Sequence, residues 1–463
     1  DSRTSIREGL LSFVRPDEVD EKAIQAFLSC LHYLSADPSE PEAYAELKTR
    51  LEEIDRTIDN PHNYLYYLAT PPLLYGVIPR HLKAEGLNRE GDGFRRIVVE
   101  KPFGYDLSSA LELNRIYLDA FREEQIYRID HFLGKETVQN ILALRFANSV
   151  FEPLWNRNYI DYVEITAVEN MGIGTRGGFY DGVGTLRDMV QNHLAQLLAV
   201  TAMEPPAAFD ASGFRNEVVK VYQSLTPLTG EDIRHSVVRG QYMASEGRKG
   251  YREEEQVPAL SRTETYLAMR LELNNWRWGG VPFYIRTGKQ MPTKVSEIVI
   301  HFKPAPYSLF RCEGGTCPVP NRLVIRIQPN EGIVLRLGMK KPGEGFEVLP
   351  MDMDFSYAEL GRLPTEDAYA RLIEDCIAGD PTLFIRSDAV ESGWRFFDPI
   401  LKYWQDVPEC PLYGYPAGSW GPLEADSLVA RQGASWTNPC KNLTNTHLYC
   451  CLLYTSPSPR DGA

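Results

Sequence analysis

The sequence predicts a protein in two parts, an α/β part of the doubly wound type followed by a larger α+β part. Up to residue 130, short buried-type strands alternate with helical patterns, which is the βαβ arrangement of a parallel sheet. From about residue 161 to 356, alternating β-branched runs follow one another with few helices between the later ones. This pattern favours a large, mainly antiparallel sheet. The 463 residues exceed one core of ordinary size, so two domains are expected.

Turn signals and hydrophobic period delimit the elements of the first part. Helical patterns over residues 17–35 and 41–57 are separated by an Ala-Asp-Pro-Ser-Glu-Pro break. Beyond them the predicted elements are, in chain order, a strand over Asn63–Ala69, a helix over Leu73–Lys83, a strand over Arg95–Pro102, a helix over Leu107–Phe121 and a strand over Gln125–Ile129.

The second part combines a few helices with many strands. Its predicted helices cover Glu136–Leu144, Thr185–Val200 and Glu366–Ile377. Its predicted strands cover Tyr162–Val168, Thr265–Leu273, Val281–Ile285, Val295–Phe302, Leu323–Ile327 and Gly332–Leu337.

A glycine-rich turn is missing from the first part of the sequence. A dinucleotide-binding (Rossmann-like) domain normally opens with a strand, a glycine-rich turn and a helix whose N-terminus holds the pyrophosphate. In residues 1–130 the nearest match is Gly91-Asp-Gly93, and the later match over Gly172–Gly177 does not open the helix that follows it. Because Asp1 is not an initiator methionine, we expect a dinucleotide-binding domain that is incomplete at its N-terminus.

Composition excludes some classes of partner. The net charge of −14 argues against nucleic acid or an anionic membrane surface as the main partner. No apolar run reaches the length that spans a membrane. The eight cysteines are scattered, and Cys312 and Cys317 lack partner ligands nearby, so we expect free thiols, no metal site and a reducing, cytoplasmic setting.

The junction between the strand over Gln125–Ile129 and the next helix is the first candidate site. It places Asp130, His131 and Lys135 where open α/β sheets bind ligands, and the helix start offers unpaired N–H groups to an anion. A phosphate would suit His131 and Lys135. The alternative is a turn with solvated charges, which is common at such junctions.

His193 is the candidate base. It falls on the apolar face of the helix over Thr185–Val200, where a rigid imidazole shielded from water can accept a proton. The carboxylates that would fix its tautomer are Asp130 and Asp188. Asp188 lies five residues before His193, so the two are not expected to share a helix face. The alternative is a core histidine with a purely structural role.

Further charges stand at strand ends. Lys101 follows the strand that begins at Arg95, Glu169 follows the strand over Tyr162–Val168, and Lys289 and Lys294 follow the strand over Val281–Ile285. If these ends converge, they form a basic pocket for an anionic small molecule that carries hydroxyls. Exposed strand ends are the alternative for each of them.

Several long motifs resemble those of the glucose-6-phosphate dehydrogenase family, in the same order and over nearly all of residues 1 to 439. The motifs are Glu100–Gly104, Arg128–Glu136, Arg187–His193, Val281–Lys289, Gln328–Glu331, Trp394–Leu401 and Gly418–Pro422. The resemblance implies oxidation of glucose 6-phosphate at C1 to 6-phosphoglucono-lactone, the first step of the oxidative pentose phosphate pathway. It implies NADP+ as the cofactor, with NAD+ possible, and a homodimer or a dimer of dimers formed through the large sheet.

The resemblance also implies a role for each candidate residue. His193 is similar to the general base and Asp130 to the carboxylate that orients it. The substrate-binding residues implied are His131 and Lys135 at the phosphate, Lys289 and Lys294 as further contacts, Glu169 and Asp188 at sugar hydroxyls, and Lys101, which the cofactor also touches.

Two departures from the family qualify these expectations. Phe132 stands where the family usually has tyrosine, which removes a hydroxyl expected to bind the phosphate. The cofactor turn is missing, so an alternative function is a sugar-phosphate-binding fragment without redox activity; a redox-neutral isomerase is a weaker one. We expect a partial dinucleotide-binding domain over 1–135, an α+β substrate-binding and dimerisation domain over 136–439, and a foreign or disordered tail over 440–463, where hydrophobic period is lost.

Overall fold

The computed structural model describes residues 2–13, 19–58, 60, 62–307, 309–312, 321–343, 345–360, 367–430 and 434–439. The chain divides into two compact units. One comprises Asp1–Tyr64, Thr70–Arg95 and Asp119–Phe121, and the other comprises Leu65–Ala69, Arg96–Leu118 and Arg122–Ala463. The boundary predicted after residue 135 stays a prediction.

The smaller unit is mainly helical. Its helices are α1 (Ser2–Phe13), α2 (Glu21–Ser29), α3 (Glu42–Ile58) and α4 (Ile78–Ala84). Helix α2 begins after Asp20, whose carboxylate accepts the backbone N–H groups of Lys22 and Ala23. The helix is shorter than the predicted range of residues 17–35.

A three-stranded sheet contains the strands predicted for the first part. It has the order β1 (Tyr64–Leu68), β2 (Arg95–Val99) and β3 (Ile126–Arg128), and helix α5 (Leu107–Ala120) links β2 to β3. Strands β2 and β3 are parallel, with Ile97 opposite Ile126. The parallel pair joined by a helix confirms the predicted βαβ arrangement.

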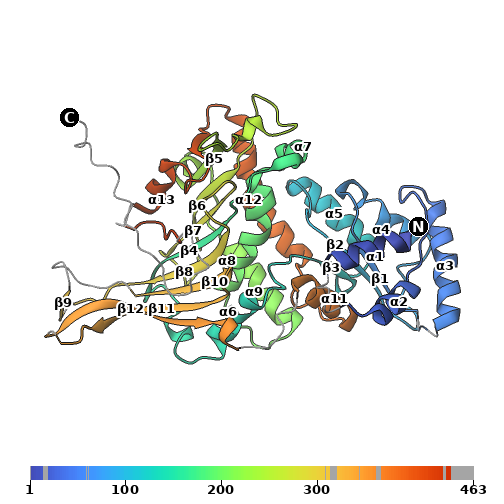
Figure 1. The fold of residues 1–463 in the computed structure, drawn as a ribbon, viewed down its shortest axis with the longest axis horizontal. Coiled ribbons are helices and arrows are strands. Elements are labelled where there is room, and N and C mark those ends of the chain that lie inside the picture. The colour runs from blue at the N-terminus through green and yellow to red at the C-terminus, as the bar shows by residue number, and fades with distance from the viewer. Residues whose placement is uncertain are drawn as a thin grey trace. The chain divides into compact units, whose positions relative to one another are not determined.

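A ten-stranded sheet dominates the larger unit (Figure 1). Its order is β13 (Tyr413–Pro416), β5 (Val237–Met243), β6 (Tyr266–Glu272), β7 (Pro282–Gly288), β4 (Ile160–Val168), β8 (Val295–Phe302), β10 (Arg322–Gln328), β11 (Gly332–Lys340), β12 (Glu347–Ser356) and β9 (Arg311–Cys312). Neighbouring strands are antiparallel except at β13–β5, β7–β4 and β12–β9. The mainly antiparallel sheet is therefore confirmed.

Helices of the larger unit pack against this sheet and against one another. Helix α6 (Glu136–Phe146) contacts β10 and α8 (Ala195–Ala202), which in turn contacts α9 (Ala211–Ser224), and α9 contacts α12 (Ser387–Asp406). The remaining helices are α7 (Gly177–Asp181), α10 (Glu231–Ser236), α11 (Ala368–Ala378) and α13 (Asp426–Ala430).

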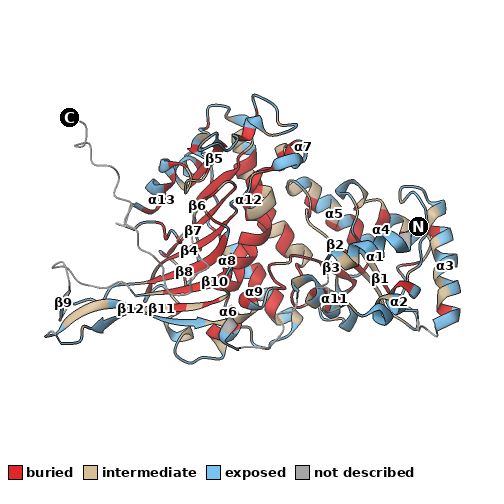
Figure 2. Ribbon diagram, in the orientation of Figure 1, coloured by how far each residue is buried: buried red, intermediate tan, exposed pale blue. Residues whose placement is uncertain are grey.

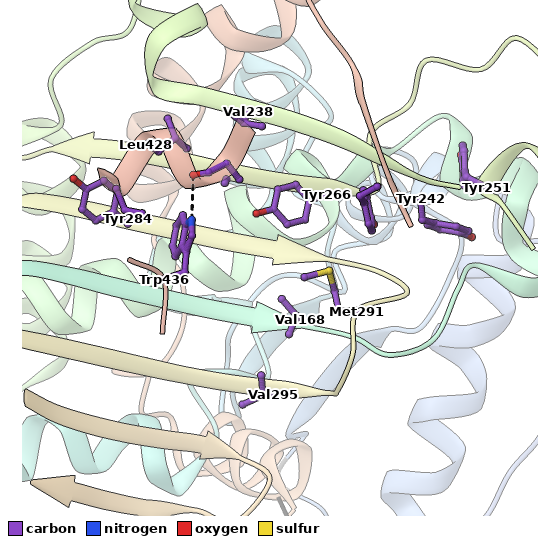
Figure 3. Close-up of a cluster of buried hydrophobic side chains, with 14 of the residues drawn as sticks. Val168, Val238, Tyr242, Tyr251, Tyr266, Tyr284, Met291, Val295, Leu428 and Trp436 are labelled. Atoms are coloured by element: carbon purple, nitrogen blue, oxygen red, sulfur yellow. Dashed lines mark hydrogen bonds between the residues drawn. The ribbon is translucent and has the colours of Figure 1, made fainter. Parts of the chain in front are cut away.

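The core lies in the middle of the ten-stranded sheet. Figure 2 shows β4, β7 and β8 as buried along nearly their whole length, whereas β12 is largely exposed. A cluster of aromatic and aliphatic side chains joins the central strands to the C-terminal segment (Figure 3). Its members come both from the strands and from the C-terminal segment. In that cluster the indole of Trp436 donates a hydrogen bond of 3.1 Å to the carbonyl of Ala425. The central strands are thus a rigid support for residues at their ends.

The helix predicted over Thr185–Val200 is the main correction to the predicted elements. Residues Leu186–Leu194 form a π-helix, labelled η6, and an α-helix (α8) begins only at Ala195. By contrast, the strand predicted over Val295–Phe302 coincides with β8. Helices α9 and α12 and strands β5, β12 and β13 were not predicted.

Three cysteines among the described side chains, Cys30, Cys376 and Cys410, are free thiols. The side chain of Cys312, the whole of Cys317 and the predicted tail over 440–463 lie outside the described residues. In the part of the chain that the structure describes, no helix is both long enough and apolar enough to cross a membrane.

Candidate active site

The ends of β2 and β3 bring the first site residues together. The two strands are parallel neighbours, with Val99 opposite Arg128, so their carboxyl ends open on the same edge of the sheet. Lys101 follows β2 and Asp130 follows β3. Such an edge is the usual ligand site of open α/β sheets, because ligands bind in the crevice outside the carboxyl ends of the strands.

His193 and Asp130 form a buried pair. Nδ1 of His193 lies 2.6 Å from Oδ1 of Asp130, and the two residues are 2% and 3% exposed. Asp130 also accepts the backbone N–H of Phe132 at 3.0 Å. Burial opposes ionisation of Asp130, but its interaction with His193 and the N–H donated by Phe132 outweigh burial, so the pKa of this carboxyl is lowered. The carboxylate therefore stays charged beside the imidazole.

Lys101 fixes the tautomer of His193. Its Nζ lies 3.0 Å from Nε2 of His193. An ammonium group can only donate, so Nε2 must be the accepting nitrogen and the ring proton must reside on Nδ1, where it is donated to Asp130. His193 is thus a neutral imidazole whose lone pair on Nε2 points toward Lys101, which is the form that a general base requires.

A row of alternating charges continues from Lys101. Its Nζ lies 3.2 Å from Oδ1 of Asp188, and Oδ2 of Asp188 lies 3.3 Å from Nζ of Lys289. Lys289 in turn donates to Oε2 of Glu169 at 2.5 Å. Burial raises the pKa of Asp188, but the charges of Lys101 and Lys289 outweigh burial and lower it. The carboxylates of the row are therefore hydrogen-bond acceptors.

The π-helix explains why Asp188 and His193 both face Lys101. In an α-helix, five residues overshoot one turn of 3.6 residues, so residues i and i+5 diverge. A π-helix instead joins residue i to residue i+5. Here the N–H of Ala195 donates to the carbonyl of Val190, five residues earlier. The expectation that Asp188 and His193 lie on different faces is wrong, because the backbone winds more widely at this point.

A second group of side chains lies near the ring of His193. The ring of His131 meets that of His193 edge-on, with centroids 4.7 Å apart. Burial lowers the pKa of His131 to about 4, so His131 is neutral near pH 7. Burial also lowers the pKa of Lys135, and the charge of Lys294 adds to this effect. Lys294 itself is exposed.

Phe132 packs against His193 and against the second group. Its ring stacks on His193 with centroids 4.5 Å apart and planes 19° from parallel, and Nζ of Lys135 lies 4.8 Å from its centroid. The residue is 3% exposed. Phe132 therefore forms an apolar wall that keeps the imidazole in place and excludes water from one of its faces.

Three contacts of the site were not predicted from the sequence. Gln328 accepts a hydrogen bond from Lys135, and Tyr369 stacks on His131 at 6.0 Å. The carboxylate of Glu264 accepts the N–H of Leu186 at the start of η6. Gln328 lies in a quoted motif, so the resemblance could have pointed to it, but no pattern singles out Glu264 or Tyr369.

The same residues include a possible set of metal ligands. Among the described side chains, Asp130, His131 and His193 offer one ligand atom each within 4.8 Å of one another. The short contact between Asp130 and His193 is a hydrogen bond between two of these groups. This arrangement suits an acid–base pair with a fixed tautomer.

Helix α5 packs closely against the loop that follows β2. Tyr67 donates to the carboxylate of Glu100, next to Lys101. Gly104 has φ +82°, and a Cβ there would lie 2.7 Å from the backbone nitrogen of Ala110, so only glycine lets this loop reach the first turn of α5. In the described residues before Asp130, no glycine-rich turn joins a strand to a helix.

Comparison with known proteins identifies the family. The family model "Glucose-6-phosphate dehydrogenase, NAD binding domain" matches residues 1–140, and "Glucose-6-phosphate dehydrogenase, C-terminal domain" matches residues 142–437. Fold and matches together define the class as an oxidoreductase with a nicotinamide dinucleotide cofactor and a larger C-terminal domain. The chain belongs to the glucose-6-phosphate dehydrogenase family.

Relatives and solved structures agree with this assignment. The chain is 51% identical to the glucose-6-phosphate 1-dehydrogenase of Aggregatibacter actinomycetemcomitans, over 92% of this chain and 86% of the relative. It is 48% identical to that of Treponema pallidum, over 94% and 85%. A glucose-6-phosphate dehydrogenase solved in complex with its substrate superposes with a TM-score of 0.86 at 34% identity, over 94% of this chain and 89% of that one.

The comparisons bear on both predicted chain ends. The NAD-binding model matches residues 1–140, which gives no support to the expectation of a truncated N-terminal domain. The match to the C-terminal model ends at residue 437, and nothing supports a foreign origin for the residues after 439.

Proposed function

We propose that the protein oxidises the C1 hydroxyl of glucose 6-phosphate to 6-phosphoglucono-lactone and passes the hydride to NADP+. The observation that carries this proposal is the row from Asp130 through His193 and Lys101 to Asp188, in which the first two residues are buried. This row places a base of defined tautomer beside acceptors for sugar hydroxyls. The relatives at 51% and 48% identity are named for this activity.

His193 takes the proton in this reaction. The C1 hydroxyl replaces Lys101 as the donor to Nε2, and the proton moves to Nε2 as negative charge develops on the C1 oxygen. Asp130 stabilises the resulting imidazolium through the Nδ1 proton. The nicotinamide ring, when bound, accepts the hydride from C1. General base catalysis of this kind contributes about 10²- to 10⁴-fold.

Asp188 and Glu169 position the sugar. Both are anionic acceptors next to Lys289, so they accept hydrogen bonds from ring hydroxyls while Lys289 and Lys101 donate to hydroxyl oxygens. The alternation of charge leaves the row close to neutral. A neutral, polyhydroxylated ring therefore fits this part of the site better than a second anionic group would.

The phosphate binds on the side of the His193 ring where His131 and Lys135 lie. Lys135 and Lys294 supply positive charge, and neutral His131 supplies one ring N–H. The ammonium of Lys135 is held by Gln328 and by the face of Phe132, so little side-chain entropy is lost when an anion binds. Lys101 is the residue that we propose to touch both sugar and cofactor.

We propose a homodimer or a dimer of dimers that uses the outer strands of the large sheet, because Met339, Met351, Met353 and Phe355 of β11 and β12 are exposed. The three free thiols fit a reducing cytoplasm. We propose a domain boundary near residue 136, where α6 begins.

The test is a direct assay of the purified chain with glucose 6-phosphate and NADP+, and in parallel with NAD+, followed through absorbance of the reduced nicotinamide. We expect turnover with NADP+, much slower turnover with glucose, and almost none for His193→Asn. Binding of glucose 6-phosphate without any cofactor reduction would contradict the proposal and favour a binding protein. Equal rates with NADP+ and NAD+ would contradict only the cofactor preference.

A further inference from the structure

Glu264 is a buried carboxylate that no step of the proposed reaction uses. It lies two residues before β6 and is 6% exposed. Its Oε1 accepts the backbone N–H of Leu186, the first residue of η6, at 3.0 Å. Its backbone carbonyl accepts the N–H of Thr185 at 3.2 Å and the Thr185 hydroxyl at 3.0 Å. One residue thus binds the start of the π-helix by two separate oxygens.

The π-helix needs such a partner. The helical segment that contains η6 begins at Gly184, two residues before Leu186. The first turn of any helix leaves backbone N–H groups without acceptors in the helix. The N-cap residue, Thr185, makes no side-chain capping bond to the helix. Buried N–H groups without acceptors are costly, so the carboxylate of Glu264 supplies from another segment what the local sequence lacks.

The approach of Glu264 depends on a glycine. Gly184 has φ +74°, and a Cβ at this position would lie 2.5 Å from Oε1 of Glu264. No other residue type leaves room for the carboxylate without a shift of the backbone or of Glu264 itself. Gly184 and Glu264 therefore act together to define where η6 begins.

Thr265, the next residue along the chain, connects Lys289 to the same segment. The carbonyl of Thr265 accepts the backbone N–H of Lys289 at 2.9 Å, and the hydroxyl of Tyr415 donates to the Lys289 carbonyl at 2.6 Å. Tyr180 donates to the Glu264 carbonyl at 3.2 Å, and its ring lies 5.1 Å from Nζ of Lys289. Residues 264 and 265 hold the helix of Asp188 and the strand end of Lys289 at one fixed separation.

We infer that Glu264 is a positioning residue for the reaction, because it fixes the start of the π-helix and so places Asp188 and His193 against Lys289 and Lys101. The inference rests on the proposed function for its chemical meaning. Glu264 touches neither sugar nor cofactor in this scheme. Its effect is transmitted through the 3.3 Å contact of Asp188 with Lys289 and the 3.0 Å contact of His193 with Lys101.

The test compares three substitutions at one position. Glu264→Gln keeps an acceptor oxygen at the same reach, whereas Glu264→Asp keeps the charge but is too short, and Glu264→Ala removes both. We expect Gln to stay within about threefold of the parent, and Asp and Ala to lose about 10- to 100-fold in kcat/KM for glucose 6-phosphate, because displacement of catalytic groups by about 1 Å has effects of that size. The KM for NADP+ should not change.

A purely structural role would give a different pattern. Glu297→Gln is the matched control, since Glu297 is a buried carboxylate of the same sheet, 1% exposed, that lies outside the proposed site. Loss of folded protein alone lowers kcat and leaves the KM for the sugar phosphate as it was. A raised KM in Glu264→Asp, absent in Glu297→Gln, supports the inference. Unchanged kcat and KM in both Asp and Ala variants would overturn it.

A calorimetric titration with glucose 6-phosphate separates this inference from the proposed function. If the parent chain binds the sugar phosphate but reduces no cofactor, the proposed redox function fails, and the Glu264 series is then judged by affinity alone. We expect Glu264→Asp to weaken binding about tenfold relative to Glu264→Gln. Should Glu264→Ala fail to fold, Gly184→Ala provides the second variant, which must show the same rise in KM; equal affinity of Gln and Asp variants refutes the positioning role.

Discussion

Helices α6 and η6 both supply groups to the same site, but they do so by opposite means. Helix α6 is a regular α-helix that contributes through its start, where Lys135 is the N-cap. The π-helix contributes through its interior, where wide winding brings Asp188 and His193 to the same lysine. The phosphate side is thus built from ordinary local structure, and the chemical side from an irregular one that distant residues must stabilise.

The largest effect should come from the base on η6. Replacing His193 by Asn keeps a side chain that can bond to Asp130 but removes the acceptor at Nε2. We expect kcat to fall by about 10²- to 10⁴-fold. Steady-state kinetics with NADP+ would measure this, with the KM for NADP+ as an internal control. A variant with a parental kcat would show that another group takes the proton.

A smaller effect should follow from the acceptor on the same helix. Asp188→Asn leaves Lys101 and Lys289 without their shared anion and weakens the bonds to sugar hydroxyls. Because hydrogen bonds to charged groups contribute about 1.5–3 kcal/mol, we expect kcat/KM to fall about 10- to 100-fold. Glu297→Gln serves again as the matched control, and equal losses in both would argue for a general loss of stability.

The helix α6 side should affect binding and not the chemical step. Lys135→Ala removes a cation from the phosphate side, so we expect the KM for glucose 6-phosphate to rise about tenfold with little change in kcat. Affinity for glucose, which lacks the phosphate, should be the same in parent and variant. A fall in kcat at an unchanged KM would instead show that Lys135 acts in the chemical step.

Stability should fall in acid because of His131. Burial lowers its pKa from 6.5 to about 4 in the folded protein, so between these values the unfolded chain binds a proton that the folded chain does not. The free energy of unfolding should decrease as pH falls through this window, by the order of 1–3 kcal/mol. Urea titrations at several pH values, with His131→Gln as the comparison, would test this. The same change of unfolding free energy with pH in parent and variant would contradict it.

The smallest effect is expected at Phe132. Phe132→Tyr adds a hydroxyl next to Lys135 while the ring can keep its stacking on His193. The added hydroxyl can donate to the phosphate. At the net contribution of a typical hydrogen bond, about 0.5–1.5 kcal/mol, the KM for glucose 6-phosphate should fall by less than about tenfold. Phe132→Leu, which removes the stacked ring, should instead lower kcat, and kinetics of the pair would separate packing from phosphate contact.

The strand–helix junction could be predicted because its signals are local. Buried strands, a polar turn and an amphipathic helix mark Asp130 and Lys135 in the sequence, and the structure places both at the edge of the sheet. Strand β8 coincides with its predicted range for a similar reason. Its successive residues point to two opposite faces, and both faces are buried along almost the whole strand. Roles in catalysis still came from the family resemblance and stay proposals.

The π-helix could not be predicted from period alone. An α-helix through Thr185–Val200 would turn Met189 inward, yet Met189 is only half-buried, whereas Gln191 and Asn192 are buried. Winding of this kind depends on Glu264, more than seventy residues away along the chain. Helix α12 was missed for another reason: Pro399 lies inside it, and proline ordinarily ends a helix.

The contact between Lys101 and Nε2 of His193 makes the base conditional on its substrate. The lone pair of the base accepts a hydrogen bond from an ammonium group, so any alcohol that enters must compete with a charged donor. A small alcohol offers Lys101 no other ligand, whereas a bound hexose brings hydroxyl oxygens to which the lysine can turn. Selectivity against small alcohols would then depend on the proton acceptor itself, in addition to the binding of the phosphate.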